Sequence, residues 1–128
     1  MSELIEQFVL NAERNGLIVH RGAIPDLPGA GQTRAIYGLA DPGSVVFAAS
    51  PEEPRAGSLL PDVHIAVLEE RNMLPDLATL FSRVGGNLPS SLAIVSGPSK
   101  SADIEQILAL GVHGPREQHV ALLGSASL

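Results

Sequence analysis

Three short apolar runs, separated from one another by segments with helical spacing, constrain the fold of this chain most. The runs are residues 63–68, 92–96 and 119–123, and none of them alternates apolar with polar positions. A strand that is apolar throughout is buried on both faces, which is typical of parallel sheets covered by helices. The sequence therefore predicts an α/β fold built on a largely parallel sheet.

Other segments predict the elements around this sheet. Glu3 and Glu6 suit the first turn of a helix that Gly16 can end in the left-handed conformation. Further strands are expected at residues 17–19 and 45–49, a helix capped by Asn72 and ended by Gly85 and Gly86, and a helix over residues 102–110. The expected inward positions are Leu4, Ile5, Phe8, Val9 and Ala12 in the first helix, Leu74, Leu77, Ala78, Phe81 and Val84 in the second, and Ile104, Ile107, Leu108 and Leu110 in the third.

Residues 22–44 are rich in Gly and Pro and show no clear periodicity. A structureless stretch of this length is unusual inside a compact domain. We interpret it either as a functional loop or as the place of a missing structural unit.

Composition limits the class of protein. The chain has 128 residues, 45% of them hydrophobic and 17% charged, which predicts one folded domain over residues 1–128. The net charge of -6 and the four aromatic residues disfavour nucleic acid as a partner. The chain has no Cys, an acidic N-terminus and no apolar run of the roughly 20 residues that a membrane span needs. We therefore expect a cytoplasmic protein with no membrane contact, no disulfide and no cysteine-held cluster.

The segment that follows the strand at residues 92–96 is a candidate anion site. Gly97, Ser99, Lys100 and Ser101 lie between this strand and the expected helix, and Asp103 lies in the first turn of that helix. Free N–H groups at a helix N-terminus, with serine hydroxyls and a lysine beside them, suit a phosphate or a carboxylate. The alternative is an ordinary helix cap, in which Ser101 caps and Asp103 favours the helix dipole.

A second candidate segment precedes the strand at residues 119–123. His113, Gly114 and Arg116 form a tight loop that could bind an anion or transfer a proton, or could be a solvated turn. The loop enters its strand at the amino end, so it is expected at the edge of the sheet opposite the first segment. Asp41, before Pro42 and Gly43, is either a functional carboxylate or part of a turn.

Other chemistry finds little support in the sequence. The four histidines lack the spacing of a metal site, so no metal is expected. No Ser sits in a Gly-x-Ser-x-Gly elbow, which leaves a hydrolase triad without its nucleophile.

Several motifs occur together in one order: residues 40–45, 58–64, 96–106 and 110–117. In this combination the chain resembles the LUD-domain proteins, and among them the lactate-utilisation protein C group. The resemblance implies a three-layer α/β sandwich like that of the NagB/RpiA/CoA-transferase group. It also implies that the chain is shortened near residues 22–40, where a helix and a strand are missing.

The resemblance further implies a component of a bacterial system that oxidises L-lactate to pyruvate. In that interpretation the chain is an accessory subunit with an anion pocket, and iron–sulfur clusters are carried by partner proteins, with no cofactor on this chain. A homo-oligomer would cover an apolar face left bare by the missing unit. Two alternatives remain: a protein that binds or converts a phosphorylated or carboxylate metabolite, and a truncated family member of unknown activity. The resemblance assigns no catalytic residues.

Overall fold

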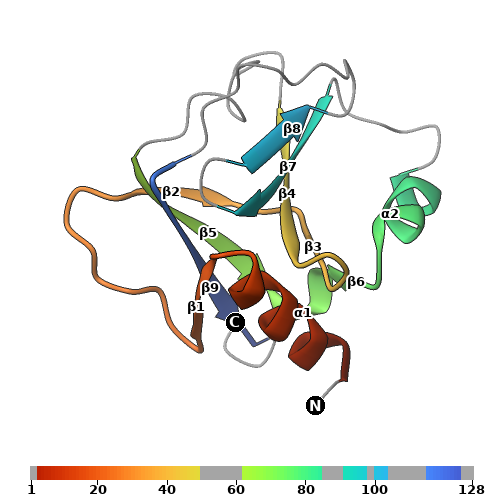
Figure 1. Ribbon diagram of the computed structural model, residues 1–128, viewed down its shortest axis with the longest axis horizontal. Coiled ribbons are helices and arrows are strands. Elements are labelled where there is room, and N and C mark those ends of the chain that lie inside the picture. Colours follow the sequence, from red (N-terminus) through yellow and green to blue (C-terminus); the bar gives the residue numbers. More distant parts are fainter. Residues whose placement is uncertain (1–2, 50–61, 85–90, 98–99, 104–114, 125–128) are drawn as a thin grey trace.

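The computed structural model describes residues 3–49, 62–84, 91–97, 100–103 and 115–124 (Figure 1). Within these ranges the strands form two sheets. Sheet A contains β1 (Ile18–Arg21), β2 (Gly31–Arg34), β5 (Val63–Glu69) and β9 (Glu117–Leu123), in the order β1-β9-β5-β2 and parallel throughout. Sheet B contains β3 (Tyr37–Leu39), β4 (Ser44–Ala49), β6 (Met73–Leu74), β7 (Ser91–Gly97) and β8 (Lys100–Asp103), in the order β6-β3-β4-β7-β8. The predicted α/β fold with a parallel sheet is confirmed.

Helix α1 (Glu3–Arg14) forms as the sequence predicts and lies beside β1 (Figure 1). Glu3 and Glu6 occupy its first turn and Arg14 its last, which suits the helix dipole at both ends. Gly16 has a φ of 94°, the left-handed conformation in which a glycine follows a helix without strain. The helix buries Ile5, Phe8 and Ala12.

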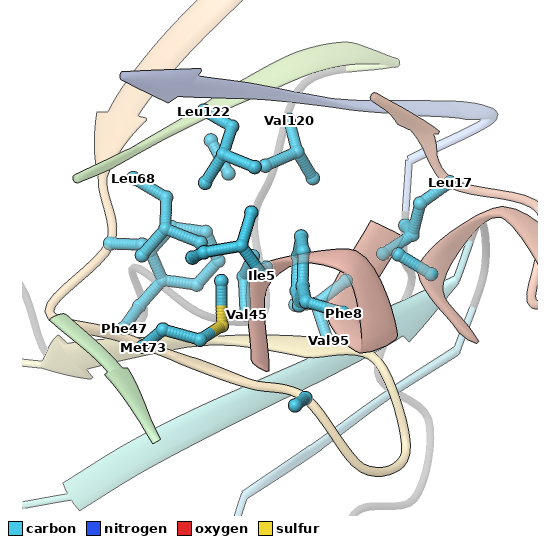
Figure 2. Packing of buried hydrophobic residues seen from close by; sticks show 14 residues of the cluster. Ile5, Phe8, Leu17, Val45, Phe47, Leu68, Met73, Val95, Val120 and Leu122 are labelled. Carbon is cyan, nitrogen blue, oxygen red and sulfur yellow. The ribbon is translucent and has the colours of Figure 1, made fainter. Parts of the chain in front are cut away.

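The main core lies between α1, sheet A and sheet B. Figure 2 shows Phe8 of α1 between Val120 of sheet A and Val95 of sheet B. Phe8 is fully buried, and burying a side chain of this size contributes about 2–3 kcal/mol relative to leaving it in water. The helix thus holds the two sheets against one core.

The second face of sheet B is also apolar. On β4, Val45 and Phe47 belong to the main core, whereas Val46 joins a smaller cluster with Leu80 of α2 (Leu77–Val84). The apolar run on β7 therefore arises from a mixed sheet with two covered faces. The expectation that residues 92–96 join the parallel sheet is wrong, because β7 pairs antiparallel with β4.

The segment 22–44 is structured, contrary to the absence of periodicity in its sequence. It contributes β2, which pairs in parallel with β5, and β3, which pairs with β4 and β6. Gly38 on β3 is required by packing, since a Cβ there would lie 2.6 Å from a methyl carbon of Leu68.

The start and the buried face of α2 differ from the prediction. Asp76 caps the helix, because its carboxylate accepts hydrogen bonds from the backbone N–H and the hydroxyl of Thr79, at 2.9 and 2.7 Å. Asn72 instead ends a short 3₁₀ helix (Glu70–Asn72). Leu80 is buried, whereas the sequence-predicted inward residues Leu77, Ala78 and Phe81 are exposed, Leu77 by 39% and Phe81 by 43%.

The third predicted helix does not begin at residue 102. Lys100–Asp103 form β8, which pairs antiparallel with β7. The first turn of a helix would leave the backbone N–H groups of these residues without partners in the helix. Pairing with β7 supplies hydrogen-bond partners to the backbone instead. The remaining positions expected in that helix, and Gly85 and Gly86, lie outside the described residues.

Candidate functional site

Two of the predicted segments meet at the C-terminal end of α1. The side-chain amide of Asn15 donates a hydrogen bond to the carbonyl oxygen of Pro42 at 2.7 Å. A Cβ at Gly97 would lie 2.5 Å from the backbone oxygen of Asn15. The turn that contains Asp41 and the end of β7 that contains Gly97 therefore contact the same residue, and Asp41 is exposed there.

The other predicted site residues are distributed differently. Lys100, Ser101 and Asp103 lie on β8, at one end of the strand order of sheet B. Arg116 is exposed and lies within ion-pair distance of Asp62, at 3.8 Å. Ser99, His113 and Gly114 lie outside the described residues. The anion site on these residues stays a prediction, without the helix N-terminus at Ser101 on which it was based.

Sheet A carries polar side chains on the face turned away from the main core, which we call the outer face. Register partners in a parallel sheet project to the same side, and alternate residues to opposite sides. Val120 and Leu122 of β9 belong to the main core, so the residues that alternate with them, His119 and Ala121, face outward. Two register rows then cross the outer face: Ile18, His119, Ile65 and Gln32, and next to it His20, Ala121, Val67 and Arg34.

A hydrogen-bonded chain of one carboxylate and two imidazoles lies at the β1 side of this face. Glu117 Oε1 is 3.0 Å from His119 Nε2, and His119 Nδ1 is 2.8 Å from His20 Nε2. With both imidazoles neutral, His119 donates to the carboxylate and accepts from His20. Among the described residues, the lone pair of His20 Nδ1 then has no donor and is the basic position. Burial, and then the neighbouring His119, lower the pKa of His20 below its usual value, which favours the neutral form. This arrangement can accept a proton at His20.

No sequence motif predicts these three hydrogen-bonded residues. His20 and His119 are 99 positions apart, and no local motif connects them. The register of β1 with β9, which places Ile18 beside His119, is the signal that joins them.

A second histidine network is buried on the core side of sheet A. His64 and Gln118 are both fully buried, and His64 Nδ1 donates to Gln118 Oε1 at 3.0 Å. His64 Nε2 then accepts from the hydroxyl of Thr33 at 2.9 Å. Burial lowers the pKa of His64, so the ring stays neutral. All three side chains connect neighbouring strands, and this network is structural.

The carboxyl ends of β2 and β5 bear a cluster of charges. Glu69 is 7% exposed, and its two oxygens contact Arg71 Nε at 2.7 Å and Arg34 Nη1 at 3.4 Å. An open depression of about 240 Å³ lies next to this cluster, lined by Ile24, Gln32, Thr33, Arg34 and Val67. In open α/β sheets, ligands bind beyond the carboxyl ends of the strands.

Metal chemistry finds no site in the part of the chain that the structure describes, where no three His, Asp or Glu side chains gather as ligands. None of the described helices is both long and apolar enough to span a membrane.

Comparison with known proteins assigns this α/β domain to a family. Residues 30–123 match the family model of the LUD domain, and the chain belongs to the LUD domain family. It is similar to the uncharacterized protein YkgG of Escherichia coli K12, with 41% identity over 91 residues, which is 66% of this chain and 39% of that protein. It is also similar to lactate utilization protein C of Halalkalibacterium halodurans, with 40% identity over 66% of this chain and 40% of that protein. A third relative is lactate utilization protein C 1 of Bacillus mycoides, with 45% identity over 60% of this chain and 36% of that protein.

These matches span about two fifths of the length of the relatives. A solved structure of similar size shows the same fold. It is a DUF162 family protein of Deinococcus radiodurans, with a TM-score of 0.67 and 19% identity, and the match covers 97% of this chain and 99% of that one.

Proposed function

We propose that this chain takes part in bacterial L-lactate utilisation, as an accessory component of a system that oxidises lactate to pyruvate. The observation that carries the proposal is the 40–45% identity with lactate utilization proteins C. The chain has no Cys, so it lacks the thiolates that hold most iron–sulfur clusters. We therefore assign the clusters of such a system to partner proteins.

A complementation experiment tests this proposal. A bacterial strain that lacks its own lactate utilization protein C is supplied with this chain and grown on L-lactate as the sole carbon source. Restored growth is expected, and growth on glucose controls for general fitness. The relative's own full-length protein serves as the positive control. Failure to grow on L-lactate, with the chain present as folded protein, would contradict the proposal.

Partners and the predicted anion contacts have their own tests. Affinity capture from the complemented strain, grown on lactate, should recover iron–sulfur proteins together with this chain. Lys100→Ala and Arg116→Ala, made separately, should each reduce growth on lactate if both residues contact one anion. Growth equal to that of the unmodified chain would remove the residue concerned from the site.

A second candidate function is conversion of a small metabolite by proton transfer. The hydrogen-bonded side chains of Glu117, His119 and His20 favour this function. A carboxylate that orients an imidazole is a common way to prepare a base. Ligands of such an enzyme should raise its melting temperature. Lactate, pyruvate, a sugar phosphate and a CoA ester are suitable probes. If none of them shifts the melting temperature, this candidate fails.

A further inference from the structure

The depression beside Arg34 has the features of a binding site for a small carboxylate. Arg34 and Gln32 both lie on β2 and face outward, two residues apart. Val67 is the register partner of Arg34 on β5, and Ile24 reaches the same depression from the segment between β1 and β2. One cationic group, one amide and two aliphatic side chains therefore surround a single hollow.

The positive charge of Arg34 is only partly neutralised by a neighbouring carboxylate. Arg34 and Arg71 share the single carboxylate of Glu69, and the shorter contact is the one made by Arg71, 2.7 Å against 3.4 Å. The side chain of Arg34 is 75% exposed, whereas that of Glu69 is 9% exposed. Among the described residues, Arg34 makes no further ion pair. Its guanidinium is thus tethered at one nitrogen, and other N–H groups remain available for a planar anion.

The size of the hollow limits the ligand. Sites for drug-sized molecules enclose about 300–1,000 Å³, and this depression measures about 240 Å³. His20 lies in the same register row as Arg34, but three strands away, about 14 Å at the usual strand spacing. A small ligand held by Arg34 therefore does not reach the hydrogen-bonded side chains of Glu117, His119 and His20, and the two sites are separate.

We propose that the depression binds a short-chain 2-hydroxy or 2-oxo carboxylate. The carboxylate pairs with the guanidinium of Arg34, the oxygen on the second carbon bonds to the amide of Gln32, and the short alkyl end contacts Val67 and Ile24. The choice of lactate and pyruvate as probes rests on the proposed function. The geometry itself selects a small carboxylate with an aliphatic end and a polar atom within reach of the Gln32 amide, and the identity of that atom as a 2-hydroxy or 2-oxo oxygen rests on the proposed function.

Titration calorimetry of the complete chain tests this site. The probes are L-lactate, pyruvate and inorganic phosphate, each at the same ionic strength. L-lactate or pyruvate should bind more tightly than phosphate, and Arg34→Gln should weaken that binding at least about tenfold, equivalent to about 1.4 kcal/mol. Arg21→Gln is the matched control, because Arg21 is also an exposed arginine paired with one carboxylate, that of Glu6, and its side chain lies on the opposite face of sheet A. The affinity of the Arg21→Gln variant for L-lactate and pyruvate should equal that of the unmodified chain.

A second variant guards against loss of fold. Arg34→Gln leaves Glu69 paired with Arg71, and circular dichroism should report a native spectrum. Ile24→Glu places a carboxylate in the depression at a position that is 42% exposed, and should also abolish binding. The proposal is overturned if neither lactate nor pyruvate binds, if phosphate binds as tightly, or if both variants bind as the unmodified chain does.

Growth and binding separate this inference from the proposed function. Restored growth on L-lactate without binding at this depression would refute the site and leave the function standing. Binding that depends on Arg34, without restored growth, would do the opposite.

Discussion

The buried hydrogen bond between His64 and Gln118 offers a quantitative test of the packing of sheet A. Gln118→Leu nearly conserves volume but removes the acceptor of the His64 Nδ1–H group, which is fully buried. An unsatisfied buried donor costs about 1–3 kcal/mol. The amide of Gln118 also donates to the carbonyl oxygens of His64 and His119, at 3.2 and 2.9 Å, and these bonds are lost as well. We expect the free energy of unfolding to fall by about 2–3 kcal/mol.

The reciprocal change shows whether the two side chains act as a pair. His64→Leu leaves Gln118 Oε1 without its donor, and should cost about 2 kcal/mol. The double variant contains neither unsatisfied group, so its cost should be smaller than the sum of the single costs by about 1–2 kcal/mol.

Urea unfolding at pH 7.5, followed by circular dichroism, measures all three variants. Gln32→Leu is the matched control, because it is the same substitution at an exposed position of sheet A, and it should change stability by less than about 0.5 kcal/mol. Single costs that add within about 0.5 kcal/mol in the double variant would refute the pairing.

Three further predictions concern pH, turn geometry and α2. Burial lowers the pKa of His64, so below about pH 6.5, its usual value, the unfolded chain binds the proton first. The free energy of unfolding should therefore decline as the pH falls from 7.5 to 5.5, and less steeply in His64→Leu; an equal slope in both proteins would contradict this assignment. Gly43→Ala should destabilise by more than about 3 kcal/mol and Gly29→Ala by about 1 kcal/mol, although φ is positive at both. A Cβ at Gly43 would lie 2.5 Å from a backbone nitrogen of α1, whereas a Cβ at Gly29 would meet no atom of the described residues within 4 Å. Equal costs of the two substitutions in urea unfolding would show that Gly43 does not pack closely against α1. Leu80→Ala should cost about 2–4 kcal/mol and Phe81→Ser less than about 0.5 kcal/mol, because only Leu80 is buried, and the reverse order in thermal unfolding would restore the face expected from the sequence.

Local patterns predicted the elements whose burial follows from their own residues. Helix α1 shows a clear period and acidic residues at its start, and β5 and β9 are apolar because both faces of sheet A are covered at Ile65 and Ala121. The apolar pattern of β7 does not reveal its pairing, since a strand in a mixed sheet with two covered faces has the same composition as one in a parallel sheet.

Boundaries and pairings depended on contacts that sequence spacing does not contain. Asp76 and Asn72 are both suitable helix caps, and the choice follows from β6, which removes Met73 and Leu74 from the helix and pairs them with β3. Residues 100–103 carry serine and aspartate, which suit a helix start, yet they pair with β7.

The candidate site shows the same division. Exposure of Asp41 follows from its Asp-Pro-Gly turn, but its approach to Gly97 requires the packing of α1. The depression beside Arg34 depends on β2, a strand whose four residues, Gly31–Arg34, include no hydrophobic side chain and so leave no apolar signal.

The place of β9 in sheet A has a consequence for biosynthesis. β9 follows all other described strands along the chain, yet it lies between β1 and β5 and joins the two through parallel pairing. A ribosome-bound chain that stops before residue 117 cannot bring His20 to His119 or close the main core, however complete sheet B is by then. Sheet A can be completed only after synthesis has passed residue 123, when β9 pairs with β5 and, about 100 residues away in sequence, with β1. Long-range pairing of this kind is slow, and it leaves strand edges open to other chains in the meantime.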